Sequence, residues 1–176
     1  MTPNADCPIV GFAAFSGTGK TTLLTRLLPV LHARGLRIGM VKHAHHSFDI
    51  DHPGKDSYEL RKAGAEQMLV ASRRRWALMR ETPERSGDPE LSELIAHLDT
   101  STLDLILVEG FKHVHFPKIE LHRPSLGHPL LAASDDSIIA VATDAPLTDT
   151  AVSVPLLDVN DPEAIADFIV EHVARH

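Results

Sequence analysis

The chain has 176 residues, 43% hydrophobic and 23% charged, a balance typical of a globular protein that is long enough to bury one substantial core. Its formal net charge of −7, counted with neutral histidines, disfavours a general nucleic-acid binder. Cys7 is the only cysteine, which excludes an intramolecular disulfide, and the absence of a long apolar run or a signal-peptide pattern predicts a cytoplasmic protein with no membrane partner.

A glycine-rich segment between a predicted strand and a predicted helix is the most specific pattern in the chain. Apolar residues 9–13 favour a strand, and residues 20–33 favour a helix that ends before Gly35. Between them lie Ala14-Phe15-Ser16-Gly17-Thr18-Gly19-Lys20-Thr21. Strand, glycine-rich loop, Lys-Thr and helix is the order of a phosphate-binding P-loop, with alanine in place of the first glycine of that motif.

The residue types of this loop suit triphosphate chemistry. Gly17 and Gly19 let the backbone turn its N–H groups towards phosphate oxygens, and the start of a helix adds further donors. Lys20 is placed to reach the terminal phosphates, and the Thr21 hydroxyl is placed to ligate Mg²⁺. We therefore expect the chain to bind a nucleoside triphosphate.

The remaining pattern alternates strands and helices. Further strands are expected over residues 36–41, 67–72, 75–79, 103–108, 118–122, 137–142 and 154–157, and further helices over residues 57–63, 89–98 and 163–175. Asp56 with Glu59, Asp88, and the segment 160–163 are expected to cap those helices. The first strand, helix and following strand form a βαβ unit, which implies parallel neighbouring strands. The predicted fold class is α/β: a single P-loop NTPase-like domain over residues 1–176, with a mostly parallel twisted sheet flanked by helices.

Two carboxylates flank the core of the strand predicted over residues 103–108. Asp104 and Glu109 are five residues apart, so roughly 16 Å separates them at ~3.3 Å per residue. Ligands bind beyond the carboxyl ends of parallel strands, which favours Glu109 as the acid near Mg²⁺ and Gly110 as a point of close approach to the γ-phosphate. The alternative is that Glu109 simply ends a core strand in solvent.

A polar segment over residues 42–57 begins where the second predicted strand ends. Such segments of P-loop proteins often order around the γ-phosphate and Mg²⁺. The candidate partners of phosphate and metal-bound water are Lys42, Asp49, Asp51 and Lys55. The candidate ligands of a transition metal are His43, His45 and His46. A solvated polar loop is the remaining alternative.

Asp144 follows a predicted strand at a position where a base-reading loop is expected. An aspartate there can accept from both N1–H and the N2 amino group of guanine, a pair that adenine does not present. The alternative is a turn-forming aspartate before Pro146.

Taken together, these segments resemble the MobB family, the adapter proteins of molybdopterin–guanine dinucleotide biosynthesis. The matching segments are residues 15–23, Lys42-His43 with His45, His46 and Asp51, residues 54–58 with Arg61 and residues 63–65, Val108-Glu109-Gly110-Phe111-Lys112, Lys118-Ile119-Glu120 and Ala142-Thr143-Asp144. The resemblance covers nearly the whole chain.

The resemblance implies a fold similar to that of the dimeric P-loop GTPases that serve metallocentre assembly. It implies binding of GTP and Mg²⁺, at most weak intrinsic hydrolysis with no catalytic residue assigned, and a homodimer. It also implies partnership with the molybdopterin guanylyltransferase that attaches GMP to molybdopterin, delivery of the cofactor to molybdoenzymes, and contact with molybdopterin or its guanine dinucleotide.

Carried onto this sequence, the resemblance assigns roles to particular residues. The nucleotide-binding residues are Ser16, Gly17, Thr18, Gly19, Lys20, Thr21, Thr22, His43, Asp51, Lys55, Gly110 and Asp144, and the metal-binding residues are Thr21 and Glu109. The loop from His43 to Asp51 would close over the γ-phosphate or a partner's pterin. Because the Asn-Lys-x-Asp motif of ordinary GTPases is absent, guanine selectivity depends on Asp144 by analogy.

Two other functions fit parts of the pattern. A small-molecule kinase shares the P-loop, with Arg80 and Arg85 flanking a short lid. A metallochaperone would use His43, His45 and His46. For hydrolysis, Arg61 acting across a dimer is a candidate for stabilising the transition state.

Overall fold

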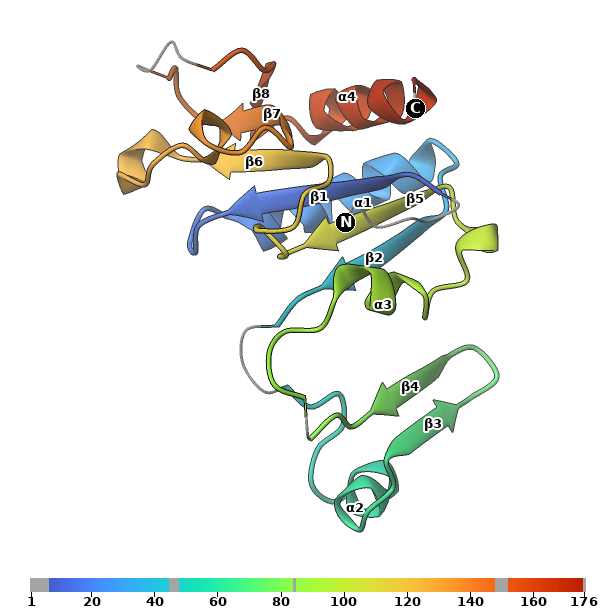
Figure 1. The fold of residues 1–176 in the computed structure, drawn as a ribbon. Coiled ribbons are helices and arrows are strands. Elements are labelled where there is room, and N and C mark those ends of the chain that lie inside the picture. The colour runs from blue at the N-terminus through green and yellow to red at the C-terminus, as the bar shows by residue number, and fades with distance from the viewer. Residues whose placement is uncertain (1–6, 45–47, 84, 148–151, 176) are drawn as a thin grey trace. The chain divides into compact units, whose positions relative to one another are not determined.

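The computed structural model describes residues 7–44, 48–83, 85–147 and 152–175. The chain divides into two compact units, one formed by Met1–His43 with Glu90–His176 and the other by Ala44–Pro89 (Figure 1). The sequence predicts a single domain, and the division into two compact units leaves that a prediction. Within the described residues, none of the helices combines the length and apolar character needed to cross a bilayer.

The first unit is built on a six-stranded sheet of order β2-β5-β1-β6-β7-β8, in which neighbouring strands run parallel (Figure 1). Its strands are β1 (Ile9–Ala14), β2 (Ile38–Lys42), β5 (Leu105–Glu109), β6 (Lys118–His122), β7 (Ile138–Thr143) and β8 (Leu156–Asp158). The parallel sheet expected from the sequence is confirmed, and β6 has the predicted bounds.

The prediction that β1 and β2 are neighbours is wrong, because β5 lies between them. Every residue of β5 is buried, and a strand that is apolar on both faces gains most from a central position. The helix between β1 and β2, α1 (Lys20–Ala33), has the bounds that its sequence predicts.

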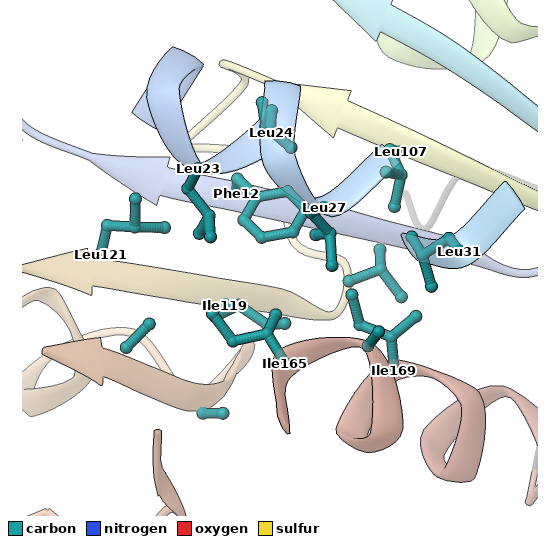
Figure 2. Close-up of a cluster of buried hydrophobic side chains, with 14 of the residues drawn as sticks. Phe12, Leu23, Leu24, Leu27, Leu31, Leu107, Ile119, Leu121, Ile165 and Ile169 are labelled. Carbon is teal, nitrogen blue, oxygen red and sulfur yellow. The ribbon is translucent and has the colours of Figure 1, made fainter. Parts of the chain in front are cut away.

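One face of the sheet is covered by α1 and α4 (Pro162–Ala174) (Figure 2). On α1, four leucines at helical spacing point into this layer, where they meet apolar residues of α4 and the central strands. The buried side chains labelled in Figure 2 are Phe12, Leu23, Leu24, Leu27, Leu31, Leu107, Ile119, Leu121, Ile165 and Ile169. At the start of α4, the Asp161 carboxylate accepts hydrogen bonds from the N–H groups of Glu163 and Ala164, which confirms the predicted cap.

The other face of β5 packs against α3 (Leu91–Ile95) and two phenylalanines of the β5–β6 connection. This helix starts later than predicted: Glu90 stands at its N-cap, so the expected cap by Asp88 is wrong. The β5–β6 connection crosses β1 at Gly11, where an added Cβ would lie 2.5 Å from the Phe116 ring. A glycine is therefore needed for this connection to pass.

The second unit contains α2 (Asp56–Lys62) and an antiparallel pair, β3 (Gln67–Ala71) and β4 (Trp76–Arg80). The expected cap of α2 by Asp56 is wrong, because Asp56 is the first helical residue and Lys55 stands at the N-cap without a side-chain hydrogen bond. Glu59 does reach back, but its carboxylate accepts from the N–H of Gly54 at 3.1 Å. The carboxylate thus closes the preceding turn rather than the helix start.

Candidate phosphate-binding site

The P-loop joins the end of β1 to the first turn of α1. The predicted residues Ser16, Gly17, Thr18, Gly19, Lys20, Thr21 and Thr22 all lie in this stretch. Gly17 and Gly19 have φ angles of 82° and 91°, a left-handed conformation that other residues adopt only with strain. Gly19 occupies the N-cap of α1 and no side chain caps the helix there, so the first N–H groups are left for a ligand or water.

The side chain of Thr18 belongs to the architecture of the loop. It is 2% exposed, and its hydroxyl donates a 2.9 Å hydrogen bond to the carbonyl of Phe15. This bond closes the loop on itself. Thr21 and Thr22 are exposed instead, so the Thr21 hydroxyl is accessible for the metal role expected of it.

Glu109 lies at the carboxyl end of β5, next to the lysine of the P-loop. Its Oε1 is 3.9 Å from Lys20 Nζ, and its Oε2 is 3.3 Å from Lys42 Nζ. Its side chain is 11% exposed, so the two ammonium groups compensate a carboxylate that is largely withdrawn from water. The predicted position of Glu109 beside the phosphate loop is confirmed; its role as a metal ligand stays a prediction.

Asp104 lies at the opposite end of the same segment and has a structural partner. It accepts hydrogen bonds from the Arg37 guanidinium at 2.8 and 2.9 Å. These hydrogen bonds lower the pKa of Asp104 to about 2. Asp104 therefore has a structural role: its ion pair with Arg37 connects the start of β2 to the start of β5.

His43 and Gly110 contact each other where β2 and β5 end. The N–H of His43 donates to the carbonyl of Glu109 at 2.8 Å, and the His43 ring lies 4.9 Å from that of Phe111. Gly110 has a φ of 99°, and an added Cβ would lie 2.7 Å from His43 Cβ. The structure thus brings both predicted residues next to Glu109, and it requires a glycine at position 110 for packing as well as for conformation.

Asp144 follows β7, and its carboxylate is ion-paired with Arg123, which follows β6. Arg123 also donates from Nε to the carbonyl of Thr18 at 2.8 Å. The sequence reasoning missed Arg123. Its position directly after a predicted strand, the same signal that pointed to Glu109 and Asp144, was sufficient to find it.

Asp51 and Lys55 belong to the second unit. There Asp51 is one of three acids around the buried guanidinium of Arg61, together with Asp49 and Glu81. The hydrogen bonds from Arg61 lower the pKa of Asp51, and the same contacts raise the pKa of Arg61. Because Arg61 is held by these acids, the arrangement disfavours it as an arginine that reaches across a dimer. His45 and His46 lie outside the described residues, so the metal-site hypothesis that includes them stays untested.

Comparison with known proteins identifies the family to which the chain is similar. The chain matches the family model for molybdopterin guanine dinucleotide synthesis protein B (MobB) over residues 9–144. It is 58% identical over 169 residues to the molybdopterin-guanine dinucleotide biosynthesis adapter protein of Escherichia coli (strain K12), covering 96% of this chain and 94% of that relative. It is 43% identical over 166 residues to the protein of the same name from Haemophilus influenzae, covering 94% and 89%.

A solved structure of MobB from Bacillus subtilis superposes with a TM-score of 0.73 at 28% identity, covering 94% of this chain and 98% of that one. The P-loop NTPase-like fold predicted from the sequence is thereby confirmed. With a P-loop, an acid beside its lysine and a family match that spans most of the sequence, the chain belongs to the molybdopterin guanine dinucleotide synthesis protein B (MobB) family.

Proposed function

We propose that the protein is a cytoplasmic GTP-binding adapter in molybdenum cofactor biosynthesis. It assists the guanylyltransferase that attaches GMP to molybdopterin, and it helps to deliver the finished cofactor to molybdoenzymes. The family membership supports the pathway, since its relatives carry the adapter name. The observation that carries nucleotide binding is the P-loop whose helix start has no side-chain cap, with Glu109 3.9 Å from the loop lysine.

The residues of this site fit a magnesium nucleotide. A hydroxyl and a carboxylate, from Thr21 and Glu109, are the oxygen ligands that Mg²⁺ prefers, and the ion would neutralise phosphate charge there. Lys20 and Lys42 both contact Glu109. Their ammonium groups are therefore close enough to the P-loop to attract a bound phosphate as well. The backbone N–H groups from Gly17 to Lys20 supply the remaining donors.

We propose at most weak intrinsic hydrolysis. Arg123, the arginine that contacts the P-loop, is already paired with Asp144, and Arg61 is enclosed by acids of its own unit. Both are therefore committed to other contacts rather than to the charge of a transition state. Single-protein turnover above about 1 s⁻¹, the low end of ordinary enzymes, would contradict this proposal.

We also propose that the protein is a homodimer. Leu69 and Leu78 are paired across β3 and β4, and Trp76 is on the same face; these side chains are 60%, 44% and 66% exposed. A two-stranded sheet is marginally stable by itself, so covering this face with a second copy would remove apolar surface from water. Sedimentation equilibrium of wild type and Trp76→Ser tests this, and a monomeric wild type would refute it.

Isothermal titration with GTP and with ATP, each with Mg²⁺, tests nucleotide binding. We expect GTP to be preferred and binding to be lost in Lys20→Ala. Arg26→Ala is the matched control, because it removes one positive charge from α1 about 9 Å further along the helix axis. A preference for ATP would move the function towards a small-molecule kinase.

A reconstituted assay tests the adapter role. We expect wild-type protein to raise the rate at which the guanylyltransferase forms molybdopterin guanine dinucleotide at limiting GTP, and Lys20→Ala to fail. An equal rate with wild type and variant would show that nucleotide binding is not what the adapter contributes.

A further inference from the structure

Arg123 connects two segments that are more than one hundred residues apart in sequence. Its Nε–H donates to the Thr18 carbonyl at 2.8 Å, and its Nη1 is ion-paired with Oδ2 of Asp144. An added Cβ on Gly19 would lie 3.6 Å from Arg123 Nη2, so the guanidinium lies directly against the P-loop. One side chain therefore contacts both the phosphate loop and the loop after β7.

The chemistry of the guanidinium makes this contact a rigid one. The group is planar, stays charged, and donates from fixed directions, so it fixes the orientation of a carboxylate better than a lysine ammonium does. Without a partner, a carboxylate that is about one quarter exposed, such as Asp144 at 26%, rotates among several positions. Arg123 thus fixes where Asp144 stands relative to the P-loop.

The pair leaves Asp144 able to bind a ligand. A carboxylate offers about four acceptor sites on two oxygens, and Arg123 contacts Oδ2. A purine ring that presents two adjacent donors can therefore still bond to this carboxylate.

We propose that Arg123 is the positioning residue for guanine selectivity. It holds the Asp144 carboxylate at a fixed place relative to the P-loop, where the carboxylate accepts from N1–H and from the N2 amino group of guanine. Arg123 itself touches neither the base nor the reacting phosphates. This inference rests on the proposed binding of GTP.

The test compares GTP, ITP and ATP binding by isothermal titration, each with Mg²⁺. Inosine lacks the N2 amino group, so the ratio of GTP to ITP affinity measures the contact of Asp144 with that group. In Arg123→Met we expect the GTP preference over ITP to fall about tenfold, the scale of one hydrogen bond to a charged group, while ATP affinity changes little. Arg123→Lys should restore part of the preference.

Two further variants separate the possible explanations. Arg37→Met breaks the Arg37–Asp104 ion pair at the other end of the sheet, and we expect it to leave all nucleotide ratios unchanged. Asp144→Asn should favour XTP over GTP, because xanthine has a carbonyl where guanine has the N2 amino group and an asparagine amide can donate to it. Thermal unfolding of each variant checks that it is folded.

The outcomes distinguish failure of this inference from failure of the proposed function. A wild type with no preference for GTP over ATP would refute guanine binding and this inference with it. A wild type that prefers GTP, combined with an Arg123→Met variant that keeps the GTP to ITP ratio, would overturn the role of Arg123 alone. An equal loss of affinity for all three nucleotides in Arg123→Met would assign Arg123 to the phosphates instead.

Discussion

Replacing Gly110 by alanine tests how the end of β5 is built beside the phosphate loop. Gly110 has a φ of 99°, and the new Cβ would lie 2.7 Å from the Cβ of His43. The left-handed conformation costs an L-residue about 1–2 kcal/mol, and an atom forced into filled space typically costs about 1–3 kcal/mol. We therefore expect the free energy of unfolding to fall by about 2–5 kcal/mol, the sum of these ranges.

Equilibrium unfolding in urea measures this loss, with Gly35→Ala as the matched control. Gly35 has a φ of 85° and no heavy atom within 4 Å of an added Cβ, so it should lose only the conformational part, about 1–2 kcal/mol. The double variant Gly110→Ala, His43→Gly lacks the His43 Cβ that the new methyl group would contact. The coupling energy from a double-mutant cycle should therefore equal the steric part of the loss in the free energy of unfolding. Equal losses for Gly110→Ala and Gly35→Ala would refute the packing argument.

Three further perturbations have defined outcomes. Leu27→Ala removes most of a fully buried side chain of α1 and should lower the free energy of unfolding in urea by about 2–5 kcal/mol. A comparable loss for Leu126→Ala, at 43% exposure, would contradict the assignment of the core. Asp161→Ala should cost about 1 kcal/mol through the lost cap of α4, and Asp161→Asn should recover most of it; two variants of equal stability would contradict the capping role. The hydrogen bonds from Arg37 lower the pKa of Asp104 from 3.8 to about 2, so the stabilisation is present above about pH 4 and is lost as the pH falls towards 2. The difference in melting temperature between wild type and Asp104→Asn should shrink over that window, and a difference independent of pH would count against the pairing.

The sequence by itself determined the parts that local chemistry controls. The P-loop is one continuous stretch of sequence. Its glycines at positions 17 and 19 predict the positive φ angles that the structure shows. The bounds of α1 and β6 follow from apolar spacing and breakers. The choice of Glu109 over Asp104 also followed from sequence. Ligands bind beyond the carboxyl ends of parallel strands, and Glu109 stands at the carboxyl end of its strand.

Strand order and long-range side-chain contacts were decided by the tertiary structure. The insertion of β5 between β1 and β2 depends on which strand gains most from burial on both faces, and no local pattern compares strands in that way. Likewise, the sequence predictions included Thr18 and Asp144 but not Arg123, which contacts both. These contacts require the ends of β1, β6 and β7 to lie side by side. Periodicity shows which residues form an element and which face it buries, whereas packing among distant elements determines which side chains meet.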